Sequence, residues 1–196
     1  MLVFLDTEYT DPVLIDLISI GMVSEDGTAV FYAERCDFRA EDCNAFVREA
    51  VLPLLDAPAG QVMTRAALAV QLRAWFATLP RRIVIACDDR TDYELLVDAL
   101  DGEVPANVAG IEDLRPRVDS TVFHQAACRH HAAPGQPWHH ALHDAKAHRA
   151  GWLAWMAARS SVEALKGKIS PPAAPVSIAA MNAAIAEEGS KDHAKR

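Results

Sequence analysis

Cysteine is scarce in this chain of 196 residues, which contains only Cys36, Cys43, Cys87 and Cys128. No two of them form a C-x-x-C pair, and their spacing is not dense. Domains held together by disulfides and sites that bind zinc through cysteine need denser patterns. The sequence therefore excludes both and favours a reducing compartment.

Long apolar runs are also lacking. A helix that crosses a bilayer needs roughly 18 apolar residues in succession, and no segment approaches this length. Asp6 and Glu8 interrupt the N-terminal segment before the apolar region of a signal peptide could form. We therefore expect a cytoplasmic protein with no membrane association.

Basic side chains are outnumbered by acidic ones. The chain has 19 Lys and Arg against 27 Asp and Glu, a net charge of -8. Wrapping of long duplex nucleic acid depends on neutralising many phosphates, so this mode of binding is excluded and any nucleic-acid contact must be local. The surplus carboxylates and the 8 histidines are residue types that a metal site uses.

The length and the apolar pattern predict one mixed α/β domain at residues 1–160, because domains have roughly 100 to 200 residues. Leu2–Leu5 is a short apolar run that predicts a buried strand. Leu14–Val23 and Ala29–Ala33 flank an Asp-Gly turn, which is typical of a β-hairpin. Residues 161–196 are expected to form a tail that is mobile or docked on a partner.

Helical patterns alternate with a further strand in the second half of the domain. A helix capped by Thr64 is expected to lead into a buried parallel strand at Ile83–Ala86, followed by a helix at Asp92–Leu100. Residues 102–118 are rich in turn formers and show no clear period. A final helix is expected to end near residue 160.

Two carboxylates end the first predicted strand. Asp6 and Glu8 are two residues apart, so on a strand their side chains point to one face. Buried together, they require either a cation between them or a proton on one of them. Asp92 and Asp144 each lie early in a predicted helix, and ligands of α/β proteins collect near the carboxyl ends of strands. The ordinary explanation for Asp6 and Glu8 is a strand end that opens into solvent. For Asp92 it is a helix cap or a first-turn acid favoured by the helix dipole.

Three motifs together resemble the DEDDh exonucleases, a family that includes proofreading exonucleases, ribonuclease T and oligoribonuclease. The motifs are D-T-E at residues 6–8, T-D-Y-E-L-L at 91–96 and H-H-A-L-H-D at 139–144. The last fits the family pattern H-x-A-x-x-D through His139, Ala141 and Asp144. The resemblance covers residues 1 to about 158 and depends on the order of the motifs and their strand or helix contexts.

The resemblance implies a ribonuclease H-like mixed β-sheet flanked by helices. It implies that Asp6, Glu8, Asp92 and Asp144 hold two Mg²⁺ or Mn²⁺ ions. These ions would activate water and stabilise the leaving oxygen, with His139 as the general base. Thr7 and Tyr9, beside the acids, are expected to line the pocket for the terminal nucleotide, and Trp138 to stack on a base.

The second motif departs from the commonest family form, which has Asn and an aromatic residue before the acid. Asp88 and Asp89 precede Asp92 here, so three acids compete for one role. We choose Asp92 because it precedes Leu95 and Leu96 at the family spacing. Because of this departure, the sequence does not predict which residues of this region bind the terminal nucleotide.

A zinc phosphodiesterase is a rival enzyme, because His139 and His143 are spaced i, i+4. The third ligand would come from His130, His131, His140 or Asp144. A second rival is a nucleic-acid-binding protein that keeps the fold without turnover. The favoured hypothesis is a metal-dependent 3′→5′ exonuclease that acts on single-stranded ends, RNA slightly favoured over DNA, and releases nucleoside 5′-monophosphates. A homodimer is a further expectation from the family.

Overall fold

The computed structural model describes residues 1–165 and 177–183. The chain divides into two compact units, Met1–Ala158 and Arg159–Arg196, and the first contains the sheet and all residues discussed below. Most of the expected tail at 161–196 lies outside the described residues, so its predicted behaviour stays a prediction. Within the described residues, no helix is both long enough and apolar enough to cross a membrane.

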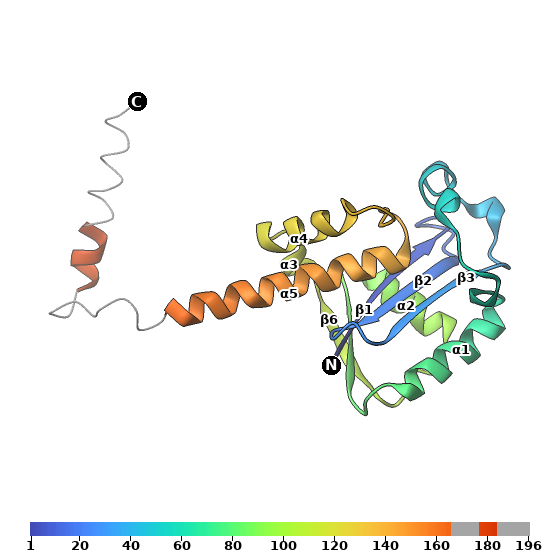
Figure 1. The fold of residues 1–196 in the computed structure, drawn as a ribbon, viewed down its shortest axis with the longest axis horizontal. Helices are drawn as coiled ribbons and strands as arrows, with labels where there is room; N and C mark the ends of the chain where they lie inside the picture. The colour runs from blue at the N-terminus through green and yellow to red at the C-terminus, as the bar shows by residue number, and fades with distance from the viewer. Residues whose placement is uncertain (166–176, 184–196) are drawn as a thin grey trace. The chain divides into compact units, whose positions relative to one another are not determined.

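A six-stranded mixed sheet forms the centre of the fold, in the order β4-β3-β2-β1-β5-β6 (Figure 1). Its strands are β1 (Leu2–Tyr9), β2 (Leu17–Ser24), β3 (Val30–Arg35), β4 (Val62–Met63), β5 (Ile83–Cys87) and β6 (Val108–Asp113). β1 pairs antiparallel with β2 and parallel with β5, and β5 pairs parallel with β6. The expected α/β fold with a mixed, helix-flanked sheet is confirmed and is consistent with a ribonuclease H-like protein.

Helices cover the sheet and connect its parallel strands. They are α1 (Arg65–Thr78), α2 (Arg90–Ala99), α3 (Arg115–Val118), α4 (Thr121–His131) and α5 (Ala141–Leu165), with the short turns η1 (Ala40–Asp42), η2 (Val47–Val51), η3 (Leu52–Leu54) and η4 (Ala59–Gln61). Side chains at the N-caps accept backbone hydrogen bonds at Thr64, Asp89 and Ser120. These caps satisfy amide groups that the first helical turn leaves unpaired.

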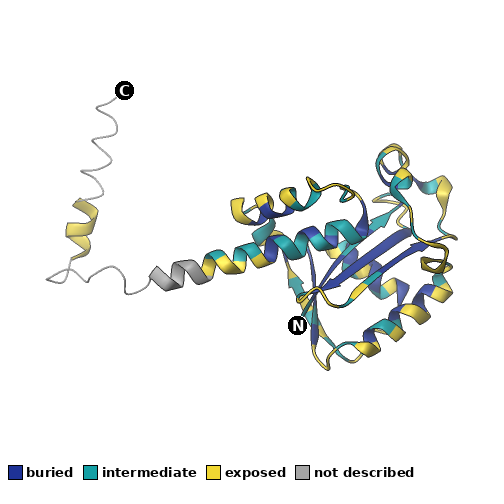
Figure 2. Cartoon of the chain, viewed as in Figure 1, coloured by how far each residue is buried: buried dark blue, intermediate teal, exposed yellow. Residues whose placement is uncertain are grey.

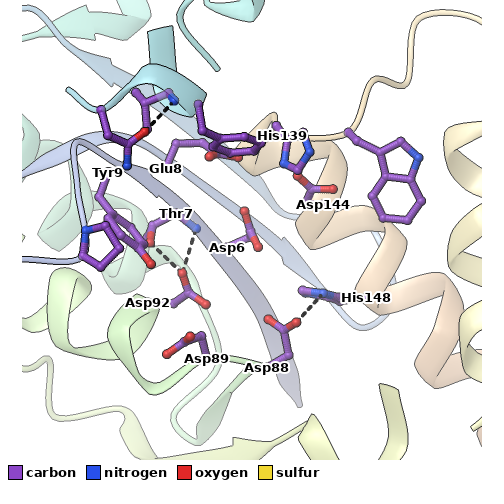
Figure 3. Close-up of a pocket in the computed structure, with 15 residues that line it drawn as sticks. Asp6, Thr7, Glu8, Tyr9, Asp88, Asp89, Asp92, His139, Asp144 and His148 are labelled. Carbon is purple, nitrogen blue, oxygen red and sulfur yellow. Dashed lines mark hydrogen bonds and ion pairs between the residues drawn. The ribbon is translucent and has the colours of Figure 1, made fainter. Parts of the chain in front are cut away.

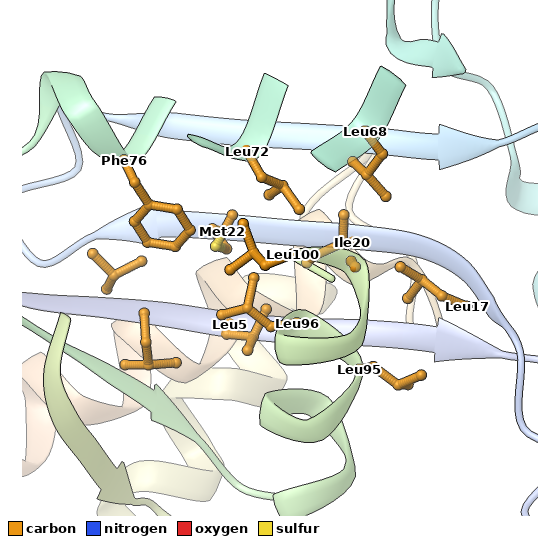
Figure 4. Packing of buried hydrophobic residues seen from close by; sticks show 14 of the residues in the cluster. Leu5, Leu17, Ile20, Met22, Leu68, Leu72, Phe76, Leu95, Leu96 and Leu100 are labelled. Carbon is orange, nitrogen blue, oxygen red and sulfur yellow. The ribbon is translucent and has the colours of Figure 1, made fainter. Parts of the chain in front are cut away.

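The alternation of side chains along β1 divides the core between two faces of the sheet. Val3 and Leu5 belong to a cluster formed with α1 and α2 (Figure 4). Phe4 belongs to a second cluster that contains residues of α4 and α5. β1 is therefore buried on both sides, as the burial colours of Figure 2 show for the central strands. Because Asp6 and Glu8 follow Phe4 in this alternation, they belong to the face that α5 covers.

The predicted hairpin and parallel strand are confirmed, with changed bounds. β2 begins at Leu17 rather than Leu14, and the turn places Gly27 at φ 80°, a backbone conformation that glycine adopts without strain.

Residues 102–118, for which the sequence pattern predicted no element, contain β6 and the short helix α3. β6 is an edge strand whose side chains alternate between partly buried and exposed. With Gly110 in its middle, it lacks the continuous apolar pattern of a central strand.

Candidate functional site

Three acidic side chains from two elements meet at the end of β1. Asp6 and Glu8 extend from β1, and Asp144 lies in the first turn of α5. One potential ligand atom from each of these three carboxylates lies within 4.8 Å of the others. Figure 3 shows them in one pocket, whose volume is about 370 Å³. The structure thus brings Asp6, Glu8 and Asp144 together, and that they hold a metal ion stays a prediction.

A close approach between β2 and α5 brings Asp144 to this point. Gly21 is the register partner of Asp6 on β2. A Cβ atom at Gly21 would lie 2.3 Å from the carbonyl carbon of Ala141, the first residue of α5. Only glycine leaves room for the helix at this distance from the sheet. The start of α5 is fixed further because the His140 amide donates to Asp144 Oδ2 at 3.1 Å.

Asp92 reaches the pocket from α2. Its side chain is buried, and its Oδ1 accepts hydrogen bonds from the Thr7 amide at 3.1 Å and the Thr7 hydroxyl at 2.6 Å. The helix cap is Asp89, whose Oδ1 accepts from the Thr91 amide, so the helix-cap explanation for Asp92 is wrong, whereas Asp92 does lie in the first turn of α2. Asp92 is, however, absent from the two potential metal-binding groups found among the described residues.

Thr7 and Tyr9 both contribute to the pocket wall. Thr7 is buried, and its hydroxyl is engaged with Asp92, so its structural contribution is to orient that carboxylate. Tyr9 lies where the β1–β2 register shifts. Contact of either residue with a nucleotide stays a prediction.

His139 lies in the loop before α5, at the pocket wall. Its φ of 61° is in the left-handed region, which non-glycine residues adopt infrequently and which occurs at functional sites. The edge-to-face contact with Phe46, at 4.9 Å between ring centroids, helps to hold the imidazole there. Trp138 is about half exposed, and one face of its ring stacks on His131 at 3.7 Å.

The sequence prediction missed two interactions at the site. His148 Nε2 lies 3.4 Å from Asp88 Oδ2, and both residues line the pocket. His131 Nε2 lies 3.1 Å from Asp144 Oδ1, and the His131 side chain is only 1% exposed. His148 follows Asp144 by one helical turn, a spacing that could have identified it. His131 has no such signal, because a loop separates it from α5.

The electrostatics of the pocket are dominated by unbalanced negative charge. Its wall includes the side chains of Asp6, Glu8, Asp88, Asp89, Asp92 and Asp144. Among the residues that the structure describes, no Lys or Arg contributes to this wall. Burial, followed by the charges of Asp144 and Asp92, raises the pKa of Glu8 to about 8. Burial also raises the pKa of Asp92 to about 7, although the hydrogen bond from Thr7 opposes the shift.

The same causes raise the pKa values of Asp6 and Asp144, the two carboxylates that converge with Glu8. Burial and then the charge of Asp92 raise the pKa of Asp6 well above its ordinary value. Burial raises the pKa of Asp144, opposed by the nearby His131 and His148. The ionised carboxylates therefore repel one another in a partly dehydrated pocket, and a cation would relieve that repulsion.

The geometry does not favour the zinc alternative. In the described part of the chain, the groups whose ligand atoms lie within 4.8 Å are Asp6–Glu8–Asp144 and Asp6–Asp88–His148. Neither contains His139 or His143. His143 is directed to Gln136, and burial followed by the charge of His140 lowers the pKa of His143 to about 4.

Fold and site together define an α/β protein with a carboxylate-lined pocket beside its central strand. Two curated proteins of Mycobacterium tuberculosis, from strains CDC 1551 / Oshkosh and ATCC 25618 / H37Rv, are similar to this chain, and each is named a 3′-5′ exoribonuclease. Each is 47% identical over 60 residues, which cover 30% of this chain and 35% of the relative. No family model matches the chain. The similarity thus supports the broad 3′→5′ exonuclease resemblance over about a third of the relatives' length, and the names do not address the DEDDh subtype.

Proposed function

We propose that this protein is a metal-dependent 3′→5′ exonuclease of the DEDDh type that releases nucleoside 5′-monophosphates from single-stranded ends. The observation that carries the proposal is the convergence of Asp6, Glu8 and Asp144 within 4.8 Å, with His139 on the same pocket wall. RNA is the favoured substrate over DNA, because both partial relatives are named exoribonucleases.

The donor set suits hard divalent cations. Asp6, Glu8, Asp92 and Asp144 would hold two Mg²⁺ or Mn²⁺ ions, because such ions prefer carboxylate oxygens. Burial raises the pKa of Glu8 to about 8 because, in the described part of the chain, no positive partner lies beside the carboxylate. A bound cation would supply that partner and allow Glu8 to lose its proton, which fits a role as metal ligand. When bound, the ions would supply electrostatic stabilisation to the attacking and leaving oxygens of the phosphodiester.

The residues of the chain have separate tasks in this proposal. His139 removes a proton from the attacking water, because its imidazole lies on the pocket wall and imidazole is the side chain that most often serves as a general base. Thr7 holds Asp92 in place through two hydrogen bonds. Tyr9 and Trp138 line the pocket, and Trp138 is about half exposed, so both are available to contact the terminal nucleotide.

The decisive experiment compares end-labelled RNA and DNA of one sequence, incubated with Mg²⁺ or Mn²⁺ and resolved by length. Shortening from the 3′ end, with nucleoside 5′-monophosphates as products and inhibition by a 3′-phosphate, is expected. Closed circular single-stranded RNA and DNA should stay intact. If a contaminant-controlled preparation linearises a circle, the enzyme is an endonuclease and the proposal is wrong.

A protein of this fold that only binds nucleic acid is the competing possibility. It would retain single strands without shortening them in either cation. Calorimetric titration of Mg²⁺ with and without a nucleoside 5′-monophosphate distinguishes the two, because the exonuclease proposal requires cation binding at the carboxylates. Absence of cation binding would favour the alternative, a protein that binds nucleic acid without cleaving it.

A further inference from the structure

A second group of potential metal-binding atoms shares Asp6 with the first. It consists of Asp6, Asp88 and His148, whose ligand atoms lie within 4.8 Å of one another. They come from β1, from the residue after β5 and from α5. Figure 3 shows Asp88 and His148 as a contacting pair beside Asp6, on the side away from Glu8 and His139. Asp6 therefore belongs to two groups, one made only of carboxylates and one that includes an imidazole.

Asp92 can offer at most one oxygen to a cation at this second position. Its Oδ1 accepts from both the amide and the hydroxyl of Thr7, which leaves only Oδ2 for another interaction. Asp92 also belongs to neither group of converging ligand atoms in the described residues. A cation beside Asp6 thus needs further donors, and Asp88 and His148 are the ones positioned to supply them.

The Asp88–His148 geometry suits two neighbouring ligands of one ion. With metal–ligand bonds of about 2.1 Å, adjacent ligands of an octahedral ion are separated by about 3 Å. His148 Nε2 and Asp88 Oδ2 are 3.4 Å apart, and their side chains are 12% and 34% exposed. Both face the pocket, so an ion can reach them without a change of the fold.

We propose that Asp6, Asp88 and His148 form the second cation subsite of this protein, and that its nitrogen ligand makes this subsite prefer Mn²⁺ to Mg²⁺. The inference rests on the proposed function and names the ligands of its second ion. Mg²⁺ takes oxygen ligands and water, whereas Mn²⁺ also takes carboxylates but belongs to the first-row ions that bind sites with nitrogen donors. The Asp6–Glu8–Asp144 subsite contains only oxygen donors and accepts either ion.

The test measures Mn²⁺ binding directly on the full chain without a histidine tag. Calorimetry should show two Mn²⁺ ions per chain, and pulsed electron paramagnetic resonance should detect the ¹⁴N coupling of a directly bound imidazole. In His148→Gln the nitrogen coupling should disappear. The affinity for one of the two Mn²⁺ ions should fall at least about tenfold, while the affinity for the other should stay unchanged. Asp88→Asn, which retains the imidazole, should show a comparable loss of affinity for one ion.

Two variants serve as controls for the nitrogen signal. His124→Gln removes an exposed histidine of α4, and His139→Gln removes the other histidine of the pocket wall. Both should retain two Mn²⁺ ions and the ¹⁴N coupling. Circular dichroism confirms that each variant is folded. With Mg²⁺ as competitor, wild type should exchange one ion more readily than the other, and His148→Gln should lose this difference.

The outcomes separate this inference from the proposed function. Two bound Mn²⁺ ions without nitrogen coupling in wild type, or coupling that persists in His148→Gln, would overturn the subsite and leave the nuclease proposal intact. In those cases His148 acts only as the hydrogen-bond partner of Asp88. If wild type binds no divalent cation, both proposals are wrong.

Discussion

Asp6 is the residue whose carboxylate belongs to both potential cation groups. Its replacement by Asn should therefore abolish turnover, because Asp6 alone among the described residues belongs to both groups. In the presence of a chelator at alkaline pH, where the acids are ionised, Asp6→Asn should also melt at a higher temperature than wild type, since it removes one charge from a mutually repelling set. Exonuclease assays and thermal melts measure the two effects.

The matched control for Asp6→Asn is Asp119→Asn, which neutralises an exposed acid outside the pocket. It should leave both activity and melting temperature close to wild type. Asp144→Asn should also lose turnover, but it additionally disturbs the contact with His131 at 3.1 Å. Wild-type rates in a folded Asp6→Asn or Asp144→Asn protein would contradict the assignment.

His139 should affect the rate and not the binding of cations. A general base contributes roughly 10²- to 10⁴-fold, so His139→Ala should lose activity by that factor while Mn²⁺ affinity changes little. His143→Ala is the comparison on the same segment and should be milder, because His143 does not line the pocket. Loss of cation binding in His139→Ala would indicate that His139 is a metal ligand. A larger rate defect in His143→Ala would assign the general-base role to His143.

At the scale of elements, the approach of α5 to β2 determines the site. Gly21→Ala should displace the start of α5, because the new Cβ would meet backbone atoms of Ala141 and Leu142 at 2.3 Å. We expect a destabilisation of about 1 to 3 kcal/mol and a large loss of activity, since both His139 and Asp144 depend on this helix start. Chemical denaturation and the exonuclease assay provide the measurements.

Gly110→Ala on β6 is the matched control for Gly21→Ala. A Cβ at Gly110 has no heavy atom within 4 Å, so the same substitution should leave stability within about 0.5 kcal/mol of wild type. Equal effects of the two substitutions would mean that the α5–β2 contact does not position the site.

At the scale of the whole molecule, the stability of the cation-free protein should depend on pH. Folding raises the pKa of Glu8 from 4.5 to about 8 and that of Asp92 from 3.8 to about 7. Between these values the folded protein binds more protons than the unfolded chain, so stability is highest below about pH 4 to 5 for these groups and is lost as pH rises through 7 to 8.

This dependence predicts that, in chelator, the melting temperature falls by several degrees between about pH 5.5 and pH 8.5. Glu8→Gln should flatten the decline, because it removes a group that must lose a proton. A cation at 100 times its dissociation constant should restore about 2.7 kcal/mol at the higher pH. A melting temperature that rises over this range in chelator would show that the acids are not buried together as described.

The local sequence determined much of the fold and part of the site. The apolar run before Asp6, the Asp26-Gly27 turn and the cap at Thr64 predict their elements because these signals depend on neighbouring residues alone. The spacing of Asp6 and Glu8 likewise placed them on one face of a strand. Strand β6 could not be predicted in this way, because its place at the sheet edge depends on pairing with β5.

The tertiary structure decided which further side chains join those acids. Asp88 and His148 meet because β5 lies beside β1 while α5 crosses the face that bears Asp6. His131 reaches Asp144 because the loop after α4 reverses the chain, so that the end of α4 lies near the start of α5 (Figure 1). Such contacts depend on packing between elements distant in the chain, whereas sequence periodicity reports only the face that each element buries. For this reason the sequence alone predicted the acidic pair of β1, and only the fold showed the imidazoles of His131 and His148 beside the acids.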